Sequence, residues 1–233
     1  MIDFPFVWTA ARLAAAREAL IEDILDAVAR HGIGDGGGVL DPKVVAAVKK
    51  VPRECFVPAM EQADAYANRP LPIGHGQTIS QPLIVALMTH LLRLKPTSKV
   101  LEVGTGSGYQ AAILAELAKE VVTVEMIAPL AADARTVLTD LGYRNIRFLE
   151  GDGRAGSPED APFDAIILTA AAKKPPDALV GQLGSEGRMV APIKERGGRQ
   201  RLVLLCRDRA GTIHRHPMFP VAFVPLTGRS GDA

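Results

Sequence analysis

The stretch KVLEVGTGSGYQAAILAEL, residues 99–117, decides the fold, because it joins a strand, a glycine turn and a helix in one short segment. Its first residues are apolar and suit a buried strand. Gly104, Gly106 and Gly108 follow, and a turn of glycines can lie against a ligand because no Cβ intervenes. Beyond them the apolar residues recur at helical spacing. Such a unit opens a doubly wound α/β sheet, in which ligands bind beyond the carboxyl ends of the strands.

The spacing of these glycines indicates which ligand to expect. G-x-G-x-G departs from the dinucleotide fingerprint G-x-G-x-x-G, in which a helix N-terminus faces a pyrophosphate. The acid before the glycines, Glu102, would repel a pyrophosphate but can accept a hydrogen bond from an ammonium group. We therefore expect a cationic nucleoside as cofactor, and S-adenosylmethionine fits.

Two more acids follow predicted strands. EVVTVE (120–125) ends in Glu125, about 20 residues after the first glycine, where Rossmann-type folds bind ribose hydroxyls. IRFLEGDGR (146–154) carries Asp152, which can accept the adenine amino hydrogen. Taken singly, Glu125 also suits a helix start and Asp152 an Asp-Gly turn. Together with the glycine turn they favour a cofactor site.

From residue 99 onward the pattern alternates between strand and helix. We predict strands at 99–103, 121–125, 146–150, 163–170 and 188–193, and helices at 109–118, 128–141 and near 176–183. The last two apolar runs, RLVLLC and the segment ending VAFVPL, predict an appended hairpin. Alternation of this kind indicates βαβ units with right-handed crossovers. The expected fold class is α/β, a Rossmann-like sandwich with an N-terminal helical subdomain (1–95), a cofactor-binding core (96–233) and a C-terminal antiparallel hairpin.

The N-terminal part is expected to be helical. Residues 9–31 form one amphipathic pattern that ends at Gly32, and a second helix runs from Pro42 to just before Pro52. The run GIGDGGG (32–38) lacks a preceding strand and a following Lys-Ser/Thr, so it predicts a connector and not a phosphate loop. Residues 66–82 are rich in proline and glycine and predict a loop. Another helix, LIVALMTHLLRL, follows, with Ser80 as its N-cap and Gln81-Pro82 in its first turn.

Composition narrows the class of protein. The chain has 233 residues, of which 48% are hydrophobic and 23% charged, as in a globular protein with a large core. Its net charge of +1 gives no reason to expect nucleic acid. Cys55 and Cys206 form no C-x-x-C pair, so we expect no metal site and a reducing compartment. No signal peptide or membrane span is recognisable. We therefore expect a cytoplasmic protein, and a monomer in preference to an oligomer.

The segment GHGQTISQP (74–82) introduces a candidate active-site serine. A serine nucleophile would need a base and a group that orients the base. The five histidines show no diagnostic spacing, and G-x-S-x-G is absent. Hydrolase chemistry at Ser80 is therefore disfavoured.

Together, these motifs resemble the protein-L-isoaspartate (D-aspartate) O-methyltransferase family, over residues 44–228. The resemblance is carried by VPRECFVP (51–58), GQTISQP (76–82), LEVGTGSGYQAAILA (101–115), GDGR (151–154), APFDAIILTAAA (161–172) and FVPLT (223–227). The glycine turn alone would indicate only a methyltransferase. Its combination with T-I-S-x-P and V-P-R-x-x-F-V-P is far more specific.

The resemblance implies roles for individual residues. Ser80 would be the active-site residue, and the isoaspartyl pocket would be lined by Thr78, Ile79, Ser80 and Val224. The cofactor would contact Glu102, Gly104, Thr105, Gly106, Gly108, Glu125, Asp152, Gly153 and Thr227. Leu83 and Val85 are aliphatic where several members carry aromatic or histidine residues, and Ile193-Lys194 replaces a frequent Val-Gly.

The implied activity is methyl transfer from S-adenosylmethionine to the free carboxylate of isoaspartyl residues in damaged proteins, which leads back to aspartate through a succinimide. Three alternatives stay open at this stage. They are a carboxyl methyltransferase acting on another small molecule or peptide, a NAD-binding oxidoreductase, and a cofactor-binding module without catalysis. The glycine spacing and Glu102 disfavour the second. The substrate-loop motif disfavours the third.

Overall fold

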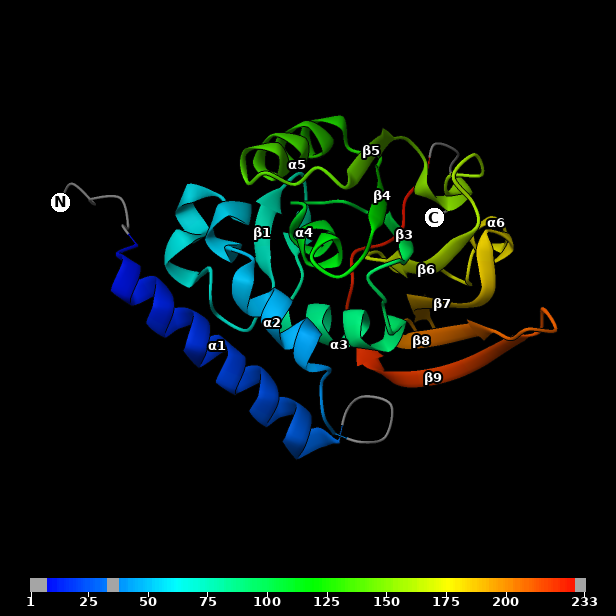
Figure 1. The fold of residues 1–233 in the computed structure, drawn as a ribbon, viewed down its shortest axis with the longest axis horizontal. Helices are drawn as coiled ribbons and strands as arrows, with labels where there is room; N and C mark the ends of the chain where they lie inside the picture. Colours follow the sequence, from blue (N-terminus) through cyan, green and yellow to red (C-terminus); the bar gives the residue numbers. More distant parts are fainter. Residues whose placement is uncertain (1–7, 33–37, 229–233) are drawn as a thin grey trace.

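The N-terminal part of the molecule is a helical layer that includes a small hairpin (Figure 1). A computed structural model describes residues 8–32 and 38–228. The elements of this layer are α1 (Ala10–His31), α2 (Pro42–Lys50), the 3₁₀ helices η1 (Arg53–Phe56) and η2 (Ala59–Asp64), strands β1 (Leu71–Gly74) and β2 (Gln77–Ile79), and α3 (Pro82–Leu92). Thr9 caps α1 by accepting from the Arg12 N–H, and Gly32 ends it with φ of 58°.

The rest of the chain builds one seven-stranded sheet in the order β5-β4-β3-β6-β7-β8-β9. Its strands are β3 (Lys99–Val103), β4 (Glu120–Glu125), β5 (Ile146–Glu150), β6 (Phe163–Leu168), β7 (Leu183–Lys194), β8 (Gln200–Arg207) and β9 (Ile213–Val221). The connecting helices are α4 (Tyr109–Ala115), α5 (Ala128–Asp140), η3 (Gly153–Ala155) and α6 (Asp177–Gly181). The five strands from β5 to β7 are parallel, whereas β8 and β9 are antiparallel to their neighbours. The predicted Rossmann-like class and appended hairpin are confirmed.

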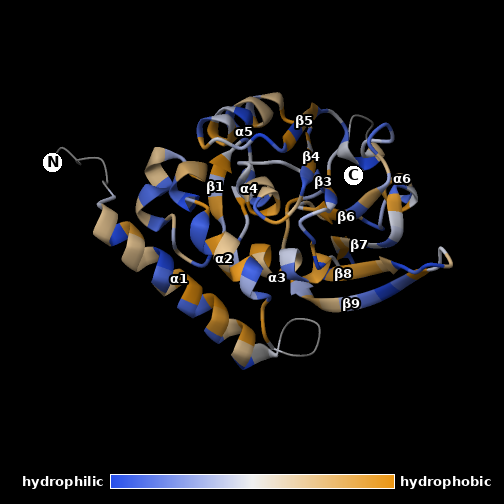
Figure 2. Cartoon of the chain, viewed as in Figure 1, coloured by the Kyte–Doolittle hydropathy of each residue, from blue (hydrophilic) through white to orange (hydrophobic). Residues whose placement is uncertain are grey.

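Both faces of the central parallel strands β3, β4 and β6 are largely buried, and successive residues face opposite sides. Val100 packs in a cluster with Met88 of α3 and Leu114 of α4, while Leu101 packs with Leu179 of α6. Residues of α3 are largely hydrophobic in the colouring of Figure 2, and those that are buried pack against the sheet. Because parallel strands share one direction, the carboxyl ends of β3, β4 and β6 meet at a single edge. The candidate site lies there.

Two details of the N-terminal layer differ from the sequence-based prediction. The segment 66–82 is not simply a loop, because Leu71 and Ile79 pair across an antiparallel hairpin that turns at Gly74–Gly76. Its density of proline and glycine concealed this short ladder. The N-cap of α3 is Gln81 and not Ser80, since Pro82 already occupies the first helical turn. Most of the predicted connector at 32–38 lies outside the described residues.

Residues 222–227 return from the outer strands to the middle of the sheet. The prediction extended the last strand to Leu226, but β9 ends at Val221 because Phe223 leaves the ladder. The backbone of Phe223 exchanges two hydrogen bonds with the side chain of Gln200, at 2.7 and 2.9 Å. Ala171 then donates to the Val224 carbonyl and accepts from the Leu226 N–H. This segment, which we call the returning segment, therefore reaches the carboxyl end of β6.

Candidate active site

The glycine turn between β3 and α4 is held against the end of β6. Gly104, Gly106 and Gly108 all have positive φ, at 96°, 54° and 90°. A Cβ on Gly104 would collide with the Thr169 hydroxyl oxygen. That hydroxyl donates to the carbonyls of Val103 and Gly104 at 3.0 and 2.6 Å. Position 104 therefore requires glycine for its backbone conformation and for its close contact.

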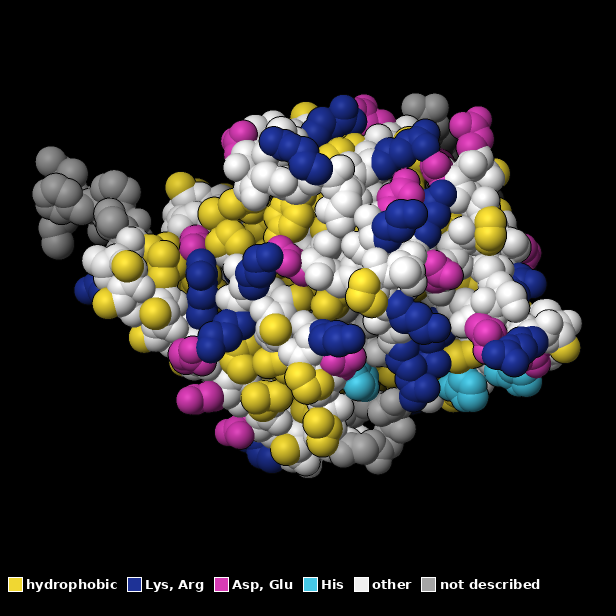
Figure 3. Space-filling model, viewed as in Figure 1, with side chains coloured by type: hydrophobic (Ala, Val, Ile, Leu, Met, Phe, Trp, Pro, Cys, Tyr) yellow, Lys and Arg dark blue, Asp and Glu magenta, His cyan; other side chains and the backbone are white. Residues whose placement is uncertain are grey.

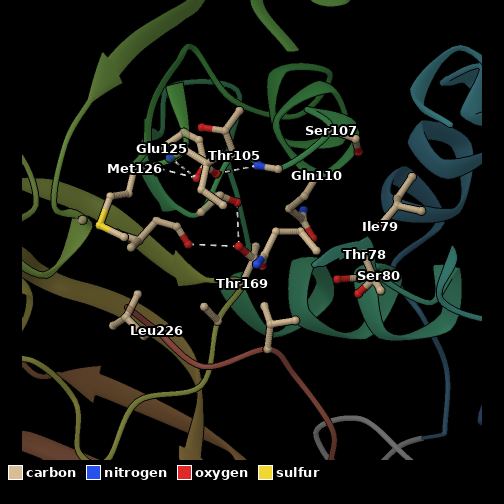
Figure 4. Close-up of a pocket in the computed structure, with 18 of the residues that line it drawn as sticks. Thr78, Ile79, Ser80, Thr105, Ser107, Gln110, Glu125, Met126, Thr169 and Leu226 are labelled. Atoms are coloured by element: carbon tan, nitrogen blue, oxygen red, sulfur yellow. Dashed lines mark hydrogen bonds between the residues drawn. The ribbon is translucent and has the colours of Figure 1, made fainter. Parts of the chain in front are cut away.

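Glu125, at the end of β4, is oriented by three backbone N–H groups. Its Oε2 accepts from Gly106, and its Oε1 accepts from Met126 and Ile127, each at 2.9 Å (Figure 4). The side chain is nearly buried and borders the cavity described next. A carboxylate has roughly four acceptor positions, so one is left for a ligand hydroxyl.

The glycine turn and Glu125 line a cavity at the carboxyl edge of the sheet, which we call the inner cavity. Its wall is contributed by residues 77–80 of the hairpin, 103–107 of the glycine turn, 124–127 after β4, 169–170 after β6, 224–227 of the returning segment, and Val85, Tyr109, Gln110 and Gly153. Glu125 and Met126 lie at one end, Thr78 and Ser80 at the other, and Thr169 between them (Figure 4). Segments far apart in sequence thus form one concave site.

A second hollow, the outer cavity, adjoins the inner one. It is lined by Pro70, Thr78, Ser80, Gln81, Ile84, Thr169 and residues 220–224. Thr78, Ser80, Thr169 and Val224 border both hollows, so the two meet there. Within the described residues the Ser80 hydroxyl has no hydrogen-bond partner and is available to a ligand. No lysine or arginine appears among the described residues that line either cavity.

Glu102 lies beneath this site and not in it. Its side chain is fully buried, Oε2 accepts a 2.6 Å hydrogen bond from the Thr123 hydroxyl, and Oε1 has no partner in the described part of the chain. The Thr123 oxygen lies 2.6 Å from that of Thr105, which does border the inner cavity. Burial, reinforced by the nearby charge of Glu125, raises the pKa of Glu102 to about 8 against the hydrogen bond from Thr123. Burial therefore favours the protonated, neutral form of this carboxyl.

The sequence of the chain matches one protein family over most of its length. The family model for protein-L-isoaspartate(D-aspartate) O-methyltransferase (PCMT) matches residues 23–231. The chain belongs to this family. Protein-L-isoaspartate O-methyltransferase 2 of Polaromonas sp. is 52% identical over 210 residues, which cover 90% of this chain and all of that one. Protein-L-isoaspartate O-methyltransferase 1 of Nitrosospira multiformis is 50% identical over 220 residues, which cover 94% of this chain and 90% of that one.

Solved structures of protein-L-isoaspartate O-methyltransferases have the same fold. One matches with a TM-score of 0.75 and 27% identity, over 89% of this chain and 66% of that one. A putative member from Plasmodium falciparum, solved in complex with S-adenosyl-L-homocysteine, matches with a TM-score of 0.73 and 27% identity, over 88% of this chain and 97% of that one.

The structure brings together most of the residues that the sequence selected. Ten of them border the inner cavity: Thr78, Ile79, Ser80, Gly104, Thr105, Gly106, Glu125, Gly153, Val224 and Thr227. They come from five separate segments of the family scaffold. Their individual contacts with cofactor and substrate stay predictions.

Three other selected residues do not border the cavity. Glu102 is fully buried and does not line the cavity, so its predicted contact with an ammonium group stays a prediction. Gly108 packs away from the cavity, and a Cβ there would lie 2.9 Å from Leu138 of α5. The Asp152 carboxylate caps η3 and accepts hydrogen bonds of 2.7–3.1 Å from the Arg154 side chain. Its neighbour Gly153 borders the cavity instead.

Sequence reasoning missed several lining residues. Met126 and Ile127 immediately follow the acid at the end of β4, and Thr169 immediately follows β6. Their position after strand ends is a usable signal, since such residues meet at one edge of a parallel sheet. Gln110 gave no signal of this kind, because its amide donates to the buried Thr89 hydroxyl from inside a helix.

Proposed function

We propose that this chain transfers the methyl group of S-adenosylmethionine to the free carboxylate of L-isoaspartyl and D-aspartyl residues in damaged proteins. Methylation would initiate repair, because the resulting ester collapses to a succinimide. The observation that carries the proposal is the meeting of two cavities at Ser80, Thr169 and Val224. The inner cavity suits the cofactor, and the outer one suits a peptide segment.

The inner cavity has features that fit S-adenosylmethionine. Gly104 borders this cavity and carries no Cβ, so its backbone can lie close to the cofactor. The free acceptor position of Glu125 suits a ribose hydroxyl. Met126 and Ile127 offer apolar surface for the adenine. When bound, S-adenosylmethionine supplies a methyl group on a positively charged sulfur.

The protein itself needs to do little chemistry. The substrate carboxylate has a reference pKa of about 3.5, so it is ionised at neutral pH and needs no general base. The Ser80 hydroxyl orients the carboxylate by donating a hydrogen bond. Holding the two partners in line supplies about 7–11 kcal/mol of the barrier. Apolar side chains in the wall of the inner cavity, such as Ile79, Val85 and Val103, help to keep water from the reacting groups, which favours a step in which opposite charges disappear.

The proposal includes a cytoplasmic monomer that does not bind nucleic acid. Cys55 and Cys206 are unpaired, as expected in a reducing compartment. No described helix is long and apolar enough to span a membrane. One copy of the chain supplies the walls of both cavities. Lys and Arg side chains are interspersed with Asp and Glu on the face in Figure 3, as expected for a net charge of +1.

Methyl transfer to matched peptides tests the proposal. Labelled S-adenosylmethionine is incubated with the protein and with two peptides that differ only in an isoaspartyl or aspartyl linkage. We expect base-labile label on the isoaspartyl peptide alone. Equal labelling of both peptides would favour a less selective carboxyl methyltransferase. No labelling of either, with cofactor bound, would reject the activity.

A further inference from the structure

Arg53 of η1 is a buried arginine directly behind the wall of the candidate site. Its side chain has no exposed surface, although arginine is among the residues least often buried. Nη2 donates to the Ser80 carbonyl at 2.9 Å and lies 3.5 Å from the Arg69 carbonyl. The guanidinium carbon lies 4.7 Å from the centre of the Tyr109 ring. Ser80 and Tyr109 both border the inner cavity.

This guanidinium has no negative partner in the described part of the chain. Nε and Nη1 form no hydrogen bond there, although the Tyr109 hydroxyl lies near enough to favour the charged guanidinium. A nearby arginine on α1 contrasts with it, because Arg17 pairs with the Glu54 carboxylate at 3.0 Å. Burial lowers the pKa of Arg53, but arginine stays charged in proteins. Burying a charge without a counter-ion costs free energy, and among the described residues two carbonyls and the Tyr109 ring offset that cost.

The position of this charge matches the needs of an anionic substrate. No described lysine or arginine borders either cavity, so Arg53 is a near source of positive potential behind the Ser80 backbone. A single residue and one aromatic ring separate it from the inner cavity, with no bulk water between to screen its field. Charges interact strongly across such a low-dielectric wall. A substrate carboxylate bound at Ser80 would supply the partner that Arg53 lacks.

We propose that Arg53 is a positioning and specificity-determining residue, which acts through the Ser80 carbonyl and the Tyr109 ring to select an anionic substrate group over a neutral one of the same shape. This inference rests on the proposed function. The inference adds to that function the residue that makes the site prefer a carboxylate.

The proposal has a kinetic consequence. Arg53 stabilises the ionised substrate, and methylation removes the charge on which that stabilisation depends. The neutral ester product is then held less tightly and leaves more readily. Because the attraction is strongest in the ground state, loss of Arg53 should raise KM while kcat stays the same or rises. A purely structural role would lower kcat and cofactor affinity together.

Calorimetry with a matched pair of peptides tests the proposal. One peptide carries isoaspartate with its free carboxylate, and the other carries a carboxamide in that place. Both are titrated into protein saturated with S-adenosylhomocysteine, which cannot react. We expect wild type to bind the carboxylate at least tenfold more tightly. Arg53→Met, which keeps an apolar stem of similar length, should bring the ratio close to one, and Arg53→Lys should retain most of it.

Arg135→Met serves as the matched control. Arg135 also lies over an aromatic ring, with its guanidinium carbon 5.3 Å from the centre of the Phe148 ring, but it is half-exposed and borders neither cavity. Arg135→Met should keep the wild-type ratio of affinities for the carboxylate and carboxamide peptides. A wild-type ratio in folded Arg53→Met would overturn the proposal. If Arg53→Met fails to fold, equal binding of the two peptides by wild type would overturn it as well. Methyl transfer by wild type to the isoaspartyl peptide is measured separately and decides the proposed function.

Discussion

The buried carboxyl of Glu102 and the hydroxyl of Thr123 are joined by a 2.6 Å hydrogen bond between neighbouring strands of the sheet. Thr123 lies in turn 2.6 Å from Thr105, so a continuous polar contact leads from the core to the inner cavity. The protonation state of Glu102 decides which of the two groups donates the hydrogen bond between Glu102 and Thr123. Ionised Glu102 can only accept from Thr123, whereas the protonated acid can donate to it.

Glu102 should make the stability of the protein depend on pH. The folded protein holds this proton up to a pKa of about 8, while the unfolded chain releases it near 4.5. The unfolded state therefore binds fewer protons between these values, so stability falls as pH rises from 5 to 8. Urea unfolding at pH 5 and pH 8 measures this loss of unfolding free energy. In Glu102→Gln the loss should be smaller than in wild type, by on the order of a few kcal/mol. Glu150→Gln, at an exposed strand end, should behave as wild type, and equal losses in all three would contradict the assignment.

Glu125 should control cofactor affinity. Glu125→Ala removes the acceptor offered to the ribose and leaves three backbone N–H groups without their partner. Each lost buried partner costs about 1–3 kcal/mol, so the Kd for S-adenosylhomocysteine should rise roughly tenfold or more. Calorimetry measures this, with Glu120→Ala at the start of the same strand as control. An unchanged Kd in a folded variant would mean that the ribose binds elsewhere.

Ser80 should act by orientation and not as a nucleophile. Ser80→Ala should lower turnover on isoaspartyl peptide by on the order of a hundredfold, corresponding to an orienting contact of a few kcal/mol. Cofactor binding should change little, and Ser185→Ala, on an exposed part of β7, should be fully active. Mass spectrometry should find no methylated enzyme before peptide is added. A methylated serine there would refute this mechanism, and full activity of Ser80→Ala would leave the serine without a catalytic role.

A side chain at Gly104 should destabilise the protein. Comparison with a second glycine separates the cost of the contact with Thr169 from the cost of the backbone conformation. Gly104 and Gly211 have similar φ of 96° and 88°, but only a Cβ at 104 meets a neighbour, the Thr169 hydroxyl. Gly211→Ala should therefore show only the backbone penalty. Gly104→Ala should lose about 1–3 kcal/mol more in unfolding free energy. Equal losses in denaturant titrations would show that the contact with Thr169 relaxes without cost.

The features that could be predicted from the sequence are those that depend only on residues close together along the chain. The strand 99–103, the glycine turn and the acid at 125 are local patterns, and the structure agrees with each. The position of Glu102 could not be predicted, because its burial depends on α3 and α4 packing over the same face of the sheet. The partnerless state of Arg53 was also hidden. A motif shows that an arginine is present, but it does not show whether a carboxylate will lie beside that arginine in the folded protein.

The returning segment sets a condition on how the protein is made. One wall of the inner cavity consists of residues 224–227, which pair with Ala171 only after the chain has passed through every strand of the sheet. A nascent chain emerging from the ribosome already carries the glycine turn and Glu125, yet its site is open on that side. Cofactor cannot be enclosed by this partly synthesised protein. The inner cavity is therefore complete only once residues 224–227 have been synthesised and have folded back, and any shorter chain lacks one of its walls.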